Sequence, residues 1–145
     1  MISRRDTSRA VAQLMPRIIQ GIQLDFFIKK GVTQTQFLVL MALHGYGCST
    51  MGHLAENMHV SMPTASGIIS RLAKAGYVKR VPSSKDRRQV VVALTAKGEE
   101  FIAQFQAVVR RRWEEVLRPL EPHELAMFYE VITKLRVQLE GMRRA

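Results

Sequence analysis

Residues 61–95 read SMPTASGIISRLAKAGYVKRVPSSKDRRQVVVALT, and this stretch decides the fold of the chain. Ser61 is a favourable residue to cap the start of a helix, and Pro63 is tolerated in a first helical turn. Gly76 suits the left-handed residue that ends a helix. The first half of the stretch therefore predicts a capped helix with a glycine stop.

Two runs rich in β-branched residues follow, 77–81 and 89–94, with a polar loop between them. We expect a two-stranded ribbon whose loop, residues 82–88, protrudes as a wing. Residues 61–88 hold seven Lys or Arg against one acid, Asp86, so this stretch carries +6 of the chain's net +10. The seven are Arg71, Lys74, Lys79, Arg80, Lys85, Arg87 and Arg88. Basic charge this concentrated favours a polyanionic partner such as DNA.

Working outward, an apolar face predicts a first helix over residues 7–30 that Gly31 ends, with Pro16 as a kink or as the true start. A capping box from Thr33 to Gln36 opens a second helix. A turn containing Cys48 follows, and Ser49 or Thr50 caps a short third helix.

Thr95 caps a fifth helix that reaches about residue 117, and Pro122 opens a sixth. In the sixth, apolar residues recur in steps of three and four: Leu125, Phe128, Ile132, Leu135, Leu139 and Met142. Such a stripe is typical either of a core face within one subunit or of a dimer seam. The pattern predicts a mainly α fold of about six helices with a small two-stranded β wing, that is, a winged helix-turn-helix with helical ends that dimerise.

We divide the 145 residues into an N-terminal dimerisation helix (1–30), a winged helix-turn-helix (31–98) and C-terminal dimerisation helices (99–145). No apolar run approaches the roughly 18 residues of a membrane span, and no signal-peptide pattern is present. The single cysteine suits a reducing compartment. We expect a cytoplasmic protein with double-stranded DNA, and no membrane, as its partner.

A helix fits the major groove, where residues near its N-terminus meet base edges. Residues 61–67 form a short, uncharged and hydroxyl-bearing end that suits such an approach. An arginine at a ribbon tip can enter a narrow minor groove. Asp86 then has its best use in fixing an arginine rotamer through a bidentate pair.

A set of motifs lies along the chain in this order: Val32-Thr33-x-x-Gln36-Phe37-x-x-Leu40, Leu54-Ala55, Val60-Ser61-x-x-Thr64, Arg71-Leu72, Gly76-Tyr77-Val78-x-Arg80, Asp86-Arg87-Arg88 and Val92-x-Leu94-Thr95-x-x-Gly98. In these motifs and their spacing the chain resembles the MarR-type (multiple antibiotic resistance regulator) transcription factors. The resemblance implies a dimer of winged helices joined by the terminal helices. It implies that Arg88 enters the minor groove, that Asp86 orients it, and that an aromatic acid or an oxidant acts as effector in many members.

We therefore expect a sequence-specific DNA-binding regulator, most often a repressor in this family, that binds a pseudo-palindromic operator as a homodimer and is released by a small aromatic acid-like effector. The DNA-contacting residues are predicted to be Ser61, Met62, Pro63, Thr64, Ser66, Gly67, Ser70 and Arg71 on the recognition helix, and Lys85, Asp86, Arg87 and Arg88 in the wing. The predicted dimerisation residues are Leu14, Ile18, Ile22, Phe128, Ile132, Leu135, Leu139 and Met142.

The alternative is a winged-helix module that binds protein, which predicts an exposed apolar patch in place of hydroxyls and arginines. An enzyme is not expected, because no phosphate-binding loop, nucleophile elbow or supported carboxylate pair occurs. No cofactor is expected. The histidines at 44, 53, 59 and 123 match no compact zinc motif, although His53 or His59 could contact phosphate. We expect Cys48 to be a packing residue and Arg110–Glu114 and Arg111–Glu115 to be surface pairs.

Overall fold

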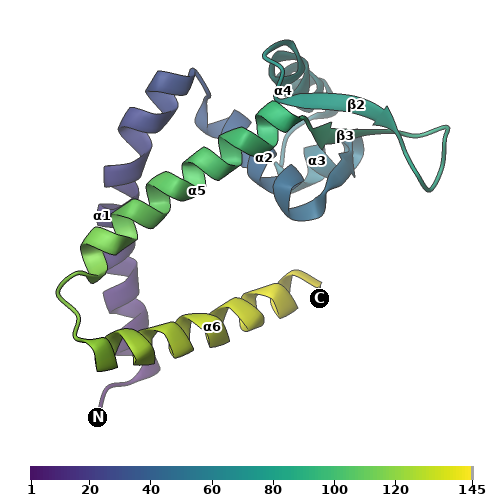
Figure 1. Ribbon diagram of the computed structural model, residues 1–145. Coiled ribbons are helices and arrows are strands. Elements are labelled where there is room, and N and C mark those ends of the chain that lie inside the picture. Colours follow the sequence, from purple (N-terminus) through teal and green to yellow (C-terminus); the bar gives the residue numbers. More distant parts are fainter. Residues whose placement is uncertain (145) are drawn as a thin grey trace. The chain divides into compact units, whose positions relative to one another are not determined.

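The computed structural model describes residues 1–144, and the side chains of all of these except 21, 23–25, 143 and 144. The elements in chain order are α1 (Arg4–Lys30), α2 (Gln34–Tyr46), β1 (Cys48–Thr50), α3 (Met51–Asn57), α4 (Met62–Lys74), β2 (Val78–Pro82), β3 (Val90–Leu94), α5 (Ala96–Leu117) and α6 (Pro122–Arg144) (Figure 1). They form two compact units, Met1–Val109 and the remainder from Arg110. The mainly helical winged helix-turn-helix expected from the sequence is confirmed.

Local capping sets the helix boundaries. Ser3 caps α1, and its hydroxyl and backbone N–H both bond the Asp6 carboxylate, which holds the pKa of Asp6 below its ordinary value. This cap starts α1 three residues before the predicted position, so Pro16 lies inside the helix and does not mark its start. Thr33 and Gln36 form the predicted capping box of α2, and Gly31 ends α1 with a φ of 65°.

The sheet has three strands, in the order β1-β3-β2, and all neighbours are antiparallel. The prediction of a two-stranded ribbon was therefore incomplete. Cys48, expected in a turn, begins the additional strand β1 and pairs with Ala93 of β3. Its hydrogen-bonded partner lies some forty residues away, so no local pattern marks three residues as a strand.

The core of the first unit lies between α2, α4, the sheet and the start of α5. Leu40, Leu54, Ile69 and Val92 are almost fully buried there. One end of this core is aromatic: the Phe26 ring of α1 lies 5.2 Å from that of Phe101 of α5, measured between centroids. Because Ile69 and Leu72 belong to this core, α4 rests on a closely packed base.

The second unit contains the end of α5 and α6, joined by a turn that ends at Pro122. Among its described side chains, the surface ion pairs are Arg110–Glu114 at 3.7 Å, Arg112–Glu115 at 3.0 Å and, on α6, Arg136–Glu140 at 3.9 Å. The first was predicted; the second replaces the predicted Arg111–Glu115, because a spacing of three also makes side chains neighbours on a helix. Within the described residues, none of the helices combines the length and the hydropathy of a bilayer span.

Candidate nucleic-acid interface

The N-terminus of α4 is an exposed cap built from hydroxyl groups. The Ser61 hydroxyl accepts a hydrogen bond from the Thr64 backbone N–H at 3.3 Å and lies 2.8 Å from the Thr64 hydroxyl. Pro63 occupies the first turn, where its missing N–H costs nothing. The predicted cap is confirmed, and the Thr64 hydroxyl already has a partner before any DNA arrives.

The two faces of α4 differ sharply. Ala65, Ile68, Ile69 and Leu72 are buried against the core. The residues predicted to contact DNA lie on the other side: Ser61, Met62, Pro63, Thr64, Ser66, Ser70 and Arg71 are exposed, and Gly67 is half-buried. A Cβ atom at Gly67 would meet no other atom within 4 Å, so the helix presents an open, shallow surface there.

The turn that leads into α4 contains a backbone feature that sequence reasoning missed. His59 has a φ of 52°, a left-handed conformation that favours glycine. Its N–H donates to the Glu56 carbonyl at 3.0 Å, and the Val60 N–H donates to the Ala55 carbonyl at 3.1 Å. The tight turn between α3 and α4 thus depends on a non-glycine residue in a sparsely populated conformation.

The C-terminus of α4 is fixed to the start of α5. The Thr95 hydroxyl donates to the Gly76 carbonyl, and the Thr95 N–H donates to the Tyr77 carbonyl at 3.0 Å. The Lys97 ammonium donates to the Ala75 carbonyl at 2.7 Å and lies 4.7 Å from the Tyr77 ring centroid. At Gly98 an added Cβ would overlap the Tyr77 carbonyl oxygen, so only glycine fits. This junction fixes the C-terminal end of α4 against the start of α5.

The wing is ordered by its own side chains. The Ser83 hydroxyl accepts from the Lys85 N–H at 3.2 Å and from the Asp86 N–H at 3.4 Å. Across the loop, the Ser83 N–H donates to the Gln89 carbonyl at 2.8 Å. Sequence reasoning did not single out Ser83, although a hydroxyl at the start of a turn is the available signal.

Asp86 has a different role from the one predicted. Its carboxylate accepts from the Arg88 backbone N–H at 3.0 Å, and no ion pair joins it to a guanidinium among the described side chains. The predicted bidentate pair is therefore corrected to a short turn that fixes the Arg88 backbone. Such turns form because the carboxylate reaches a backbone N–H two residues on more easily than it holds a long, solvated side chain.

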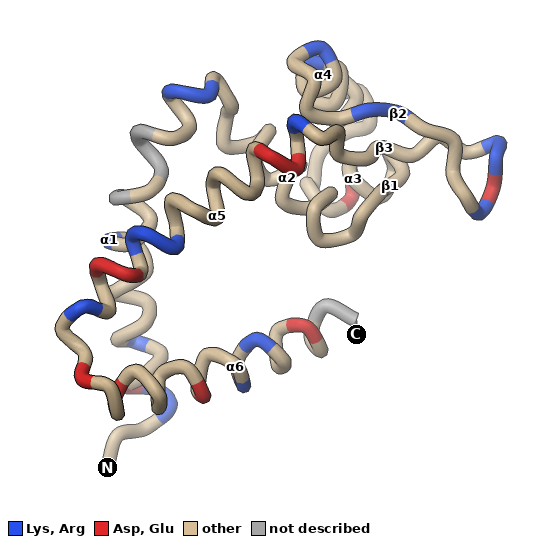
Figure 2. Tube along the Cα trace, in the orientation of Figure 1, with Lys and Arg blue, Asp and Glu red and all other residues tan. Residues whose placement is uncertain are grey.

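The positive charge of this region is not neutralised within the chain. Figure 2 shows Lys and Arg, in blue, at the end of α4, along β2 and at the tip of the β2–β3 loop. Residues 61–88 take part in none of the ion pairs found among the described residues. Lys85, Arg87 and Arg88 are exposed at the wing tip. The surface is therefore open to an anionic partner.

Two of the four histidines, His44 and His53, have side-chain partners that the sequence did not reveal. His44 lies 3.1 Å from the Glu99 carboxylate. The His53 ring lies 2.9 Å from the hydroxyl of buried Ser49, and on its other side 3.2 Å from the Asn57 amide. These contacts tie helices to the sheet and to α5, and among the described residues no group of three His, Cys, Asp or Glu could hold a metal. Cys48 is exposed on β1, so its expected role as a packing residue is corrected.

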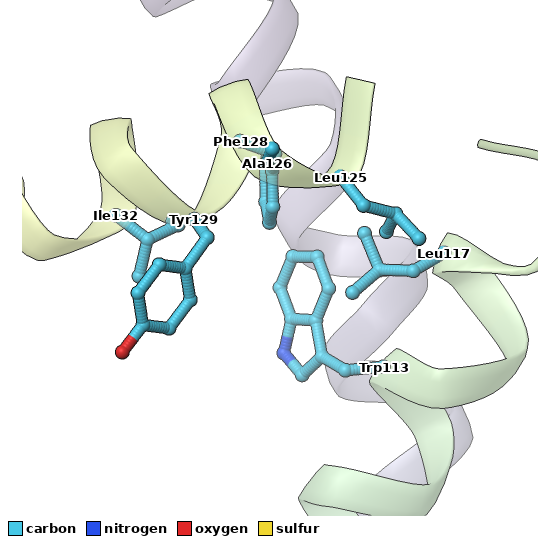
Figure 3. Close-up of a pocket in the computed structure, with 7 residues that line it drawn as sticks. All are labelled: Trp113, Leu117, Leu125, Ala126, Phe128, Tyr129 and Ile132. Atoms are coloured by element: carbon cyan, nitrogen blue, oxygen red, sulfur yellow. The ribbon is translucent and has the colours of Figure 1, made fainter. Parts of the chain in front are cut away.

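The second unit offers a different kind of surface. The Trp113 ring lies 6.2 Å from that of Phe128, between centroids, and the two border a cavity of about 740 Å³. Figure 3 shows the Trp113 side chain of α5 directed towards residues of α6. The cavity is lined by Trp113, Leu117, Leu125, Ala126, Phe128, Tyr129 and Ile132. An apolar surface of this kind is typical of a site that another apolar surface covers.

The predicted dimerisation residues fall into two groups. Leu14, Ile132, Leu135, Leu139 and Met142 are exposed, and Phe128 is half-buried. Ile18 and Ile22 are only 4% and 6% exposed, so the chain itself covers them, and their assignment to a dimer interface is corrected. They share a helix face with buried Phe26, which packs into the core.

Comparison with known proteins agrees with this architecture. The model of the MarR family matches residues 32–90. The chain is 31% identical over 118 residues to the HTH-type transcriptional regulator YfiV of Bacillus subtilis, a match that covers 81% of this chain and 74% of that protein. It is 29% identical over 105 residues to the multiple antibiotic resistance protein MarR of Salmonella typhimurium, covering 72% of this chain and 73% of that one.

Solved structures show the same fold. The transcriptional regulator Tm0710 of Thermotoga maritima superposes with a TM-score of 0.82 at 22% identity, over 98% of this chain and 99% of that one. Wild-type MarR of E. coli, in its apo form, gives 0.63 at 24% identity over 93% and 97%. Members of this family are transcriptional regulators and not enzymes. The chain, with its winged helix and the family's matching segment, belongs to the MarR family of transcriptional regulators.

Proposed function

We propose that this protein is a homodimeric transcriptional repressor that binds a pseudo-palindromic operator through α4 and the wing. The observation that carries the proposal is that an exposed, hydroxyl-bearing helix N-terminus and an arginine-bearing loop lie in one unit, with no carboxylate paired to their cations among the described side chains. Neither feature is covered by another segment of the described chain.

In this proposal α4 enters the major groove. Ser61 and Thr64 bring hydroxyl groups to its tip, and Arg71, about two turns further along the helix, reaches the phosphate backbone. The wing places Arg88 in the neighbouring minor groove, where the negative potential is strongest. Asp86 holds the Arg88 backbone in position through its turn. Two such units bind half-sites about one helical turn of DNA apart.

The dimer forms in this proposal through the exposed apolar stripe of α6 and the cavity around Trp113. A second copy of the chain is the natural partner, because symmetric dimers bury the same patch of both subunits. Light scattering at micromolar protein should give the mass of a dimer. A monomeric mass would contradict this part of the proposal without touching the DNA-binding part.

We also propose release by a small aromatic acid. The support is the resemblance to family members that sense such compounds. By linkage, the acid lowers operator affinity only as far as it prefers the released form of the dimer. Salicylate or benzoate added to a preformed complex tests this: a concentration-dependent loss of anisotropy is expected, and an unchanged signal at millimolar acid would remove the effector from the proposal.

The test of DNA binding is a fluorescence-anisotropy titration against the DNA upstream of the protein's own gene and against duplex DNA of arbitrary sequence. Arg88→Ala should weaken binding to both while leaving the melting temperature close to that of the wild type, because Arg88 is exposed. Thr64→Ala should reduce the preference for the upstream DNA more than the general affinity. A wild type that binds neither DNA in low salt would favour the alternative, a winged-helix module that binds protein.

A further inference from the structure

Arg80 lies where the recognition helix meets the wing. In the register of the sheet, Arg80 pairs with Val92 and Val78 pairs with Leu94. Paired residues of an antiparallel ladder share a face, and Val78, Val92 and Leu94 are all buried. Arg80 thus stands on the face of β2 that looks towards the core and α4, in the middle of this edge strand, and its side chain is exposed. Its neighbour Lys79 stands on the opposite face.

The Arg80 side chain crosses from β2 to α4. Its Nη2 atom donates to the Ser70 hydroxyl at 3.3 Å. Ser70 lies on the exposed side of α4, next to Arg71. The only side-chain hydrogen bond of Arg80 within the described part of the chain is this one, and no carboxylate there pairs with it. A guanidinium has five N–H donors, so most of them remain available for an anion.

A guanidinium held by a neutral hydroxyl keeps its full charge and gains a fixed direction. An arginine side chain loses rotamer freedom when it is immobilised. The bond to Ser70 restricts this freedom before DNA binds.

The location decides which anion this group meets. When a helix occupies the major groove and the adjoining ribbon reaches the next minor groove, the sugar–phosphate backbone that separates the two grooves passes between them. Arg80 bridges those two elements and is exposed there. We propose that Arg80 is a phosphate-binding residue that grips the backbone between the major-groove and minor-groove contacts, and that Ser70 positions its guanidinium.

This inference rests on the proposed DNA-binding function and adds a residue to it. The competing interpretation is that Arg80 is a brace between α4 and β2 with no contact to DNA. The salt dependence of binding separates the two, because each phosphate that a side chain neutralises adds about 0.9 to the slope of log K against log salt, whereas a brace adds nothing.

The experiment is an anisotropy titration with labelled duplex DNA of arbitrary sequence at several salt concentrations. It uses the wild type, Arg80→Gln, Ser70→Ala and the matched control Lys79→Met. Arg80→Gln retains an amide that can reach Ser70 but lacks the charge. We expect its slope to be smaller than that of the wild type by about one for each subunit bound. Lys79→Met removes a charge from the opposite face of the same strand and should leave the slope unchanged.

Ser70→Ala should keep the wild-type slope and weaken binding by a few-fold, because the charge remains while its direction is no longer fixed. An unchanged slope in Arg80→Gln, or an equal reduction of the slope in Arg80→Gln and Lys79→Met, would overturn the proposal.

If Arg80→Gln does not fold, Arg80→Lys takes its place. This variant should keep the slope and lose affinity as Ser70→Ala does, and unchanged affinity would refute the positioning role. A wild type without salt-dependent binding would refute the DNA-binding function itself.

Discussion

The winged region, residues 61–95, and the C-terminal helices, residues 110–142, differ in how much of their surface chemistry is satisfied within one chain. In the winged region the polar groups find partners within the chain: Ser61 caps α4, Asp86 bonds the Arg88 backbone, and Thr95 bonds the Gly76 carbonyl. In α6, by contrast, Leu135, Leu139 and Met142 are more than half exposed. The first region is preorganised by its own contacts, and the second has an apolar surface that one chain leaves uncovered.

The largest expected effect is on self-association through the C-terminal helices. Leu135→Glu places a charge in the exposed stripe of α6, and burying a leucine contributes about 1.5–3 kcal/mol. Because a symmetric dimer contains the substitution twice, self-association should weaken by at least roughly a hundredfold, as measured by sedimentation across a dilution series.

Val137→Glu is the matched control for that experiment. Val137 is also exposed, but it lies two residues from both Leu135 and Leu139 and so on the opposite side of the helix. The Val137→Glu variant should therefore remain a dimer. Equal dissociation of the two variants would mean that the stripe has no special role and that α6 is simply sensitive to charge.

The next largest effect is on the stability of the winged region and its junction with α5. Gly98→Ala forces a methyl group against the Tyr77 carbonyl oxygen and the Leu94 side chain, and overpacking of this kind costs about 1–3 kcal/mol. We expect a lower midpoint of chemical denaturation with an unchanged slope. Gly52→Ala is the control, since an added Cβ there meets nothing within 4 Å. It should be neutral or stabilising, and a similar loss in both variants would contradict the close packing of Gly98 against the Tyr77 carbonyl.

The same comparison explains what the sequence could predict. Features that join residues a few positions apart can be predicted from the residue types alone. These are the cap of α4, the capping box of α2 and the end of α4 at Gly76. The stripe of α6 was visible for the same reason. Periodicity cannot say whether an apolar helix face is covered by its own chain. The same periodicity therefore predicts that Ile18 and Ile22 of α1 lie in a dimer interface, although the chain buries them.

Features that depend on distant residues stayed hidden. Strand β1 exists through its pairing with β3, and Arg80 reaches Ser70 across ten positions of the chain. Asp86 shows a subtler limit. The motif indicated correctly that this residue matters to the wing arginine, but a carboxylate can bond a backbone N–H or a guanidinium, and only coordinates distinguish the two.

A smaller effect tests that distinction. Asp86→Asn keeps an oxygen that can accept from the Arg88 N–H and removes the acid from the DNA-facing loop, so DNA affinity should be unchanged or higher. Asp86→Ala loses the bond, worth about 0.5–1.5 kcal/mol, and should weaken binding in anisotropy by roughly two- to tenfold. If Asn and Ala weaken binding equally, the charge of Asp86 matters and an ion pair with an arginine forms when DNA binds.

The smallest effect concerns His59, in the turn that leads into the preorganised winged region, where the backbone holds strain. A left-handed conformation costs a non-glycine residue roughly 1 kcal/mol, whereas glycine adopts it freely. His59→Gly should raise the free energy of unfolding by about 0.5–1 kcal/mol, reduced somewhat by the greater freedom of glycine in the unfolded chain. His59→Ala keeps the strain and should change stability little. A gain in stability from alanine as well would show that the histidine side chain, and not its backbone, is the unfavourable element of this turn. A loss of DNA affinity in both variants would mark the exposed His59 ring as a phosphate contact.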